Sequence, residues 1–288
     1  MQKKSDSIPE VTHYTPESRL RHPLRLLKEM WHDLKASREL GWRLFVRDIS
    51  AQYRQTALGY FWAIFPPLVS TFILIVLKSS SMIEDKGFGM PYPAYAFMGT
   101  VFFQVFVDSL NAPLKVINNS KAILTKINMP REAFILSGIG DVLFSFSIKL
   151  LLLVCVFVIY GVKVGWEVFL VPIPLLGMLI MGTMIGVLLI PFGLLFQDIQ
   201  SALLIFTSGL LFISPVGYST ATGGLIGKLM QLNPVTPLLM AAKDLVAGHI
   251  PSNLMPFVLV FGSAFILLVI GWMIYRLALP IIIERIGM

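Results

Sequence analysis

Six long apolar stretches limit what this chain can fold into. They cover roughly residues 57–77, 94–117, 133–160, 169–196, 201–221 and 254–279. A helix needs about 20 mostly apolar residues to cross the ~30 Å hydrocarbon layer of a bilayer. Only 14% of the 288 residues are charged, whereas soluble domains carry roughly 25%. The pattern therefore predicts an all-α integral membrane protein with six transmembrane helices.

The residues before the first apolar stretch divide into a polar tail and an amphipathic segment. Residues 1–22 are polar, which predicts a flexible tail. In residues 23–56 apolar side chains recur at helical spacing, which predicts an amphipathic helix lying in the membrane interface. Gly41 is expected to divide this segment into two helices. Residues 57–288 then form the predicted transmembrane domain.

Three arginines lie on one side of the amphipathic segment. On an ideal helix Arg43, Arg47 and Arg54 fall along one flank of its apolar face. Attraction to anionic headgroups is worth about 1 kcal/mol per basic residue near the membrane surface. A guanidinium also binds phosphate oxygens bidentately, which an ammonium cannot do. The stripe is therefore a candidate phosphate site, with a non-specific membrane anchor as the alternative.

The basic residues indicate how the chain sits in the membrane. Of 23 Lys and Arg residues, eleven lie in residues 1–56, four in 115–131 and two in 276–288, against five in the connections on the other side. Cytoplasmic segments are enriched in Lys and Arg, so we predict cytoplasmic termini in the bacterial inner membrane. A net charge of +7 gathered beside apolar stretches fits anionic lipid and argues against a nucleic-acid partner.

The sequence has none of the residue patterns of an enzyme. Cys155 is the single cysteine and the four histidines are scattered, so neither a metal site nor a catalytic residue is predicted. Residues 224–229 (Gly-Leu-Ile-Gly-Lys-Leu) have neither the first glycine nor the Ser or Thr of a phosphate-binding loop. No cofactor is expected in this chain, and any ATP hydrolysis has to occur in another one.

The predicted spans contain charges, glycines and prolines that a purely apolar bundle does not need. A charge at the centre of a membrane helix costs about 2.5–3.5 kcal/mol, so Asp108, Asp141 and Lys149 are expected to face the bundle interior or water. For Asp108 and Asp141 we favour a position near the membrane interface or a pair with a neighbouring residue. A proton relay is the alternative.

Gly182 and Gly186 are expected to pack helices within one subunit, with dimerisation as the alternative. Prolines in the spans suggest bent helices around a pathway, or ordinary kinks.

Five motifs follow one another along the chain. They are Arg47-Asp48-Ile49 with Tyr53-Arg54-Gln55-Thr56-Ala57-Leu58-Gly59, Trp62, Pro66 and Pro67; Asn118-Asn119-Ser120-Lys121 to Met129-Pro130-Arg131-Glu132; Phe196-Gln197-Asp198-Ile199; Ser214-Pro215-Val216-Gly217-Tyr218; and Leu232-Asn233-Pro234-Val235-Thr236-Pro237. In this order they resemble the permease (transmembrane) subunits of type-2 ATP-binding-cassette polysaccharide exporters, the O-antigen, capsule and teichoic-acid family. Gln197 stands where these relatives have an arginine, so no role is carried over to that position.

The resemblance implies a half-transporter. Two copies would form the pathway, and a cytoplasmic dimer of ATP-binding-cassette ATPases, which binds ATP and Mg, would dock beneath them. Residues 222–253 resemble the family's short re-entrant helices between spans five and six. The implied cargo is a lipid-linked glycan, whose phosphate the arginine stripe would collect. The connection 118–131 would be the coupling helix, which contacts the ATPase through Lys121, Lys126, Pro130 and Arg131.

Aromatic side chains at the start of the bundle suit such a cargo. Sugar rings pack their C–H faces on aromatic rings, which makes Tyr60, Trp62, Phe65 and Phe103 candidate substrate-binding residues. Anchoring in interfacial aromatic belts is the alternative for each of them.

Other functions fit part of the pattern. A permease of the same fold could move a drug, haem or a simple lipid, and an ion-coupled transporter would use the intramembrane carboxylates. An enzyme acting on lipid-linked sugars would need catalytic groups clustered in its loops, and the outer connections offer too few.

Overall fold

A computed structural model describes residues 23–54, 59, 61–80, 89–121, 130–196, 198–218, 224–251 and 254–287. Its helices, in order, are α1 (Pro23–Ala36), α2 (Arg38–Arg54), α3 (Phe61–Ser79), α4 (Tyr92–Asn119), α6 (Glu132–Ile159), the 3-10 helix η2 (Trp166–Leu170), α7 (Pro172–Leu195), α8 (Asp198–Ile213), α9 (Gly224–Leu232), α10 (Val235–Val246) and α11 (Leu254–Gly287). Within these ranges no residue lies in a strand, so the all-α prediction is confirmed.

Among the described residues, five helical segments are long and apolar enough to cross a membrane. They are α3, α4, α6, η2 with α7, and α11. The fifth predicted span, 201–221, corresponds to α8, which ends at Ile213 after 16 residues, about 24 Å at 1.5 Å per residue. Pro215 explains the early end, because a proline disfavours helical conformation in the residue before it and has no N–H to donate. The count of six spans therefore stays a prediction.

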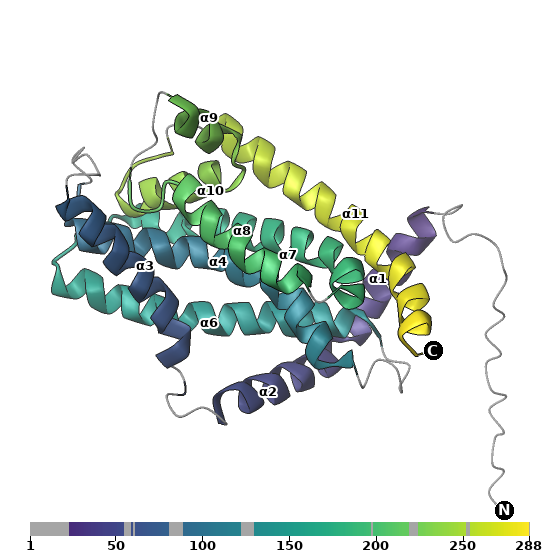
Figure 1. Ribbon diagram of the computed structural model, residues 1–288. Coiled ribbons are helices and arrows are strands. Elements are labelled where there is room, and N and C mark those ends of the chain that lie inside the picture. The colour runs from purple at the N-terminus through teal and green to yellow at the C-terminus, as the bar shows by residue number, and fades with distance from the viewer. Residues whose placement is uncertain are drawn as a thin grey trace, which may run out of the picture.

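Helices α4 and α7 form the centre of the bundle. Most of each is buried, whereas α3, α6 and α11 are buried over only a small part of their surface. Figure 1 shows α6 and α11 on opposite sides of this central pair, with α3 crossing near one end. The outer helices expose many large apolar side chains, as expected where lipid or a second subunit covers them.

Two glycines allow α7 to approach α4 closely. A Cβ atom on Gly182 would lie 2.6 Å from the carbonyl oxygen of Phe106, and one on Gly186 would lie 2.5 Å from that of Leu110. Small residues let helix backbones touch in this way. The small-xxx-small pair therefore packs helices within one chain, as the sequence predicted.

The amphipathic segment folds as two helices, but not with the predicted division. The break lies at Ser37, whose hydroxyl donates to the carbonyl oxygen of Asp33 at 2.6 Å, and Gly41 lies inside α2. The prediction of a break at Gly41 was wrong because this glycine serves a close contact. A Cβ there would lie 2.9 Å from the Cβ of Leu136 on α6. Gly41 thus lets α2 pack directly on α6.

A buried lysine joins the short helix α10 to the end of α8. Lys243 is buried, and its Nζ donates to the carbonyl oxygens of Pro215 at 2.6 Å and Val216 at 2.7 Å. The same ammonium lies 3.9 Å from the ring centroid of Tyr95 on α4. Helices α9 and α10 occupy the segment predicted to be re-entrant, and their depth in the membrane stays a prediction.

We predict that Gly186→Ala lowers the thermal unfolding midpoint of the purified protein, measured by tryptophan fluorescence in detergent. The added methyl group overlaps the backbone of α4, and such overpacking costs about 1–3 kcal/mol. Gly209→Ala on α8 is the matched control, because no atom lies within 4 Å of a Cβ there. It should leave the midpoint unchanged or raise it by helix propensity. Equal midpoints for the two variants would contradict the α4–α7 contact.

Candidate functional site

One face of α4 carries a stripe of polar side chains. Its members follow one another at intervals of four, three, four and four residues, which places them on one side of a helix. They are Gln104, Asp108, Asn111, Lys115 and Asn119. Sequence reasoning singled out only Asp108, although this spacing is the signal that would have revealed the other four. The stripe faces α6, α2 and the first turns of α3.

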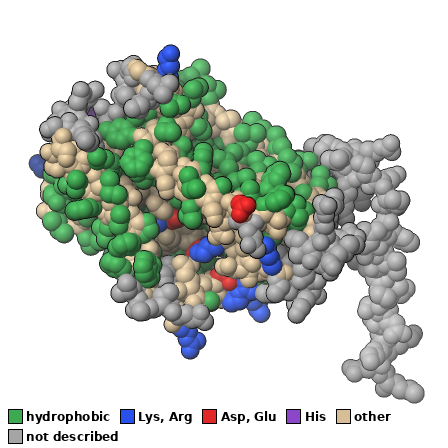
Figure 2. Space-filling model, viewed as in Figure 1, with side chains coloured by type: hydrophobic (Ala, Val, Ile, Leu, Met, Phe, Trp, Pro, Cys, Tyr) green, Lys and Arg blue, Asp and Glu red, His purple; other side chains and the backbone are tan. Residues whose placement is uncertain are grey.

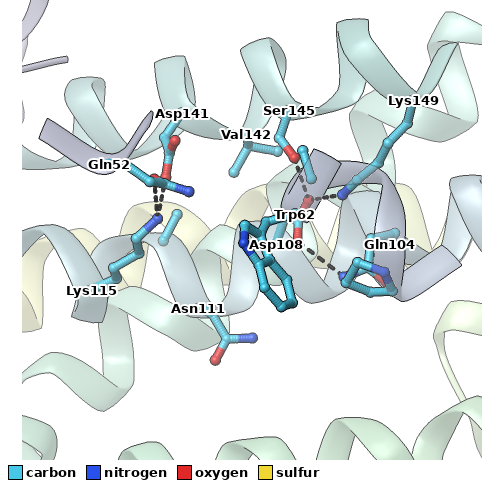
Figure 3. A pocket seen from close by; sticks show the side chains of 13 residues that line it. Gln52, Trp62, Gln104, Asp108, Asn111, Lys115, Asp141, Val142, Ser145 and Lys149 are labelled. Carbon is cyan, nitrogen blue, oxygen red and sulfur yellow. Dashed lines mark hydrogen bonds and ion pairs between the residues drawn. The ribbon is translucent and has the colours of Figure 1, made fainter. Parts of the chain in front are cut away.

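The deepest part of the stripe holds an ion pair between α4 and α6. Lys149 Nζ lies 2.5 Å from Asp108 Oδ2, and its side chain is only 3% exposed. Ser145 donates to the same oxygen at 3.3 Å, and Gln104 donates to Oδ1 at 3.1 Å. Figure 3 shows these side chains converging on Asp108. Both charges are therefore paired, which confirms the favoured interpretation of the intramembrane residues.

A second ion pair lies further along the same two helices. Lys115 Nζ on α4 lies 2.9 Å from Asp141 Oδ2 on α6, and it also donates to the amide oxygen of Gln52 on α2 at 2.9 Å. The lysine of this pair is more exposed to solvent than Lys149, since the Lys115 side chain is 38% exposed. It ties α2, α4 and α6 together at one point (Figure 3).

A third ion pair lies where α2 meets the end of α4. Arg47 contacts Asp48 Oδ1 through Nε at 2.8 Å and through Nη2 at 2.7 Å, and its Nη2 also donates to Ser120 Oγ at 3.1 Å. The other carboxylate oxygen of Asp48, Oδ2, is buried and has no hydrogen-bond partner in the part of the chain that the structure describes.

The three pairs line two neighbouring polar cavities, which together are called the groove. A cavity of about 170 Å³ surrounds Asp108 and Lys149, and one of about 500 Å³ lies beside Arg47 and Asp48. Gln52, Lys115 and Asp141 border both cavities and lie between them. Figure 2 shows acidic and basic side chains inside a hollow in an otherwise largely hydrophobic face. The groove therefore opens to the surface and carries polar groups into the apolar bundle.

Helix α3, which contains two prolines, forms one wall of the groove. Pro66 and Pro67 have no backbone N–H, which leaves the carbonyls four residues earlier, those of Trp62 and Ala63, without a helical partner. Trp62, Ala63 and Pro66 all line the smaller cavity. Prolines are tolerated in membrane helices where a wet cavity satisfies the freed carbonyls, which is the setting that this groove provides.

The structure separates the predicted substrate-binding residues. Arg47 and Trp62 line the groove, and the ring of Phe65 lies 5.6 Å from that of Trp62. Arg43 points away from it and pairs with Glu39 at 2.6 Å on the exposed side of α2. Arg54 is exposed at the end of α2.

The remaining two aromatic candidates are Phe103 and Tyr60. Phe103 is 1% exposed and packs near Phe106, so its ring is part of the core of this chain. Aromatic composition gave no information on which side of α4 this ring occupies. Tyr60 lies outside the described residues.

The predicted coupling segment is described only at its two ends. Lys121 lies two residues after the last residue of α4, Pro130 is exposed, and the carbonyl oxygen of Arg131 accepts a hydrogen bond from Tyr275 of α11 at 3.2 Å. Lys126 lies outside the described residues.

Arg276 of α11 pairs with Glu132 at 3.3 Å and with Asp33 of α1. The start of α6 is thereby fixed to both α1 and α11.

Comparison with known proteins gives one informative match. The chain is 24% identical over 230 residues, 78% of its length, to the O-antigen export system permease protein RfbA of Myxococcus xanthus, of which it covers 85%. No protein-family model matches the chain. The match confirms the resemblance to polysaccharide-export permeases that the motifs indicated.

We predict that Lys149→Met destabilises the protein by about 3–5 kcal/mol, because it leaves the buried Asp108 carboxylate without its cation. The double variant Lys149→Met/Asp108→Leu should recover much of this loss, since neither charge then remains. Chemical unfolding in detergent measures both. Arg43→Gln, which breaks the exposed pair on α2, should cost less than about 1 kcal/mol. A single variant as stable as the wild type would show that the buried pair does not form.

Proposed function

We propose that this chain is the transmembrane subunit of an ATP-driven exporter that moves a lipid-linked polysaccharide, of O-antigen or capsular type, across the bacterial inner membrane. The observation that carries the proposal is the match to an O-antigen export permease over 78% of the chain. The apolar helices and the polar groove among α2, α3, α4 and α6 support it, because a hydrophilic cargo needs polar partners inside the bilayer.

The chain acts as a translocation subunit without catalysis of its own. Its sequence offers no phosphate-binding loop, so a separate ATPase dimer binds ATP and Mg and hydrolyses the nucleotide. The proposed contact with that dimer is the segment 118–131, through Lys121, Lys126, Pro130 and Arg131. The ion pairs that fix the start of α6 to α1 and α11 give this segment a firm base from which movement reaches the bundle.

The proposed assembly is a dimer of this chain with both termini in the cytoplasm. In that orientation the end of the groove beside Asn119 opens at the cytoplasmic surface, where the lipid-linked substrate arrives. Arg54 is exposed there, which suits an encounter with the phosphate of the lipid, while Arg47 lies at the mouth of the groove in its pair with Asp48. The exposed rings of Trp62 and Phe65 provide apolar surface next to it.

The ion pairs favour this proposal over an ion-coupled transporter. Asp108 and Asp141 each contact a lysine ammonium, at 2.5 and 2.9 Å. Breaking a buried ion pair is costly, and a coupling ion could bind these carboxylates only by displacing their lysines. The groove carboxylates therefore serve as fixed polar groups.

Deleting the gene from its source bacterium tests the proposal. We expect loss of one surface polysaccharide and accumulation of its lipid-linked precursor inside the cell, both restored by the wild-type gene. Export in energised vesicles should stop when ATP is removed and continue when the proton gradient alone is collapsed. An unchanged surface polysaccharide, together with altered sensitivity to a drug or haem, would show that a permease of the same fold moves another cargo.

We predict that the double variant Lys121→Glu/Lys126→Glu weakens co-purification with the ATPase or uncouples ATP hydrolysis from export. Reversing two charges at a docking surface replaces attraction by repulsion. The matched control is Lys163→Glu/Lys228→Glu, on the predicted outer side, which should keep wild-type export and ATPase association. If both double variants behave as the wild type, Lys121 and Lys126 orient the chain in the membrane by the positive-inside rule and do not couple it to the ATPase.

A further inference from the structure

The wider end of the groove has the composition of a carbohydrate subsite. This cavity of about 500 Å³ combines one aromatic ring with carboxylates, amides and two cations. The side chains concerned are Phe45, Asp48, Asp141, Gln52, Asn119, Arg47 and Lys115. A site of this kind offers a ring for an apolar sugar face and several groups that bond hydroxyls.

One group in this cavity requires a hydrogen-bond donor. Arg47 engages only Oδ1 of Asp48, and the buried Oδ2 has no partner among the described residues. Burying a carboxylate oxygen without a donor is costly, and Arg47 is held on the other oxygen and on Ser120. A small rotation of the Asp48 side chain that brings Oδ2 to the cavity surface lets a ligand hydroxyl donate to it.

The positive and negative side chains that line the cavity are equal in number, which favours an uncharged ligand. Arg47 and Lys115 are matched by Asp48 and Asp141, and the deeper pair of Lys149 with Asp108 is also neutral. An anionic sugar entering here would have to displace a carboxylate from its cation and leave two negative charges close together. Like charges in a medium of low dielectric constant repel strongly, so an acidic ligand is disfavoured.

A neutral sugar can bind while every ion pair stays formed. A carboxylate has about four lone-pair sites and an ammonium has three N–H donors. Lys115 uses two of its donors, on Asp141 and on Gln52, so one is left for a ligand oxygen. Hydroxyl groups, which both donate and accept, match this mixture of spare donors and acceptors.

We therefore propose that the cavity beside Asp48 and Asp141 is a subsite for an uncharged sugar residue of the cargo, and that this exporter carries a neutral rather than an acidic polysaccharide. The inference rests on the proposed function and narrows it. It assigns to Asp48 the role of accepting a sugar hydroxyl through Oδ2.

The first test is the composition of the polysaccharide that disappears when the gene is deleted. We expect a repeating unit without uronic acids, sialic acids or phosphate groups, determined by sugar analysis of the purified chain. An acidic repeating unit would overturn the inference and leave the proposed function intact. If the deletion removes no polysaccharide, the proposed function fails and the inference falls with it.

The second test uses the two carboxylates. Asp48→Asn and Asp141→Asn should each lower export by about tenfold, since each removes a charged acceptor from the cargo, while membrane level and ATPase association stay at wild-type values. Glu39→Gln, on the exposed side of α2 outside the cavity, should export normally. Wild-type export by the double variant Asp48→Asn/Asp141→Asn would overturn the assignment. A fall in membrane level that accounts for the lost export would do the same, because the carboxylates would then be structural only.

Discussion

The close contact between α4 and α7 determines how the remaining helices are arranged. Association of helices in a bilayer gains little from the hydrophobic effect and relies on close packing. Gly182 and Gly186 provide it by bringing α7 against the backbone at Phe106 and Leu110. These two residues lie on the side of α4 opposite the polar stripe. Fixing one face of α4 on α7 therefore turns the polar face toward α6 and α2, where its charges meet their partners.

The groove combines a structural end and an open end. Lys149, at the inner end, is almost fully buried in its pair with Asp108. Lys115 and Arg47 are both much more exposed, at 38% and 39%. Buried ion pairs are expensive to break, so the inner pair holds α4 and α6 in register. The outer pairs, which water and ligands can reach, offer their spare donors and acceptors to a cargo.

Much of the fold was predictable because it follows from local patterns. Apolar stretches located five helical segments that the structure confirms as long enough to span, and the glycine pair was assigned correctly. The break at Ser37 was missed because Gly41 looks like a helix breaker in sequence, whereas in space it is a contact point for α6. At Gly41 the contact with α6 therefore outweighs the low intrinsic helix propensity of glycine.

The site was less predictable, because it depends on pairing between distant segments. Asp108 and Lys149 are separated by 41 residues and meet only through the register of α4 on α6. The polar stripe itself was visible as a helical period, but its orientation was not. The same ambiguity placed Phe103 among the substrate contacts, although its ring points into the core. Helical periodicity defines the faces of a helix and not the direction in which each face points.

Lys243 has a consequence for how the chain is assembled during its synthesis. The carbonyl oxygens of Pro215 and Val216, at the end of α8, bond to a side chain that is added 28 and 27 residues later. Buried carbonyls without a donor are costly, so the end of α8 cannot take up its final packing until α10 has been made and has folded back. The segment from α8 to α10 therefore enters the bundle as one unit. A chain halted between residues 216 and 243 has the end of α8 without the side chain that caps it.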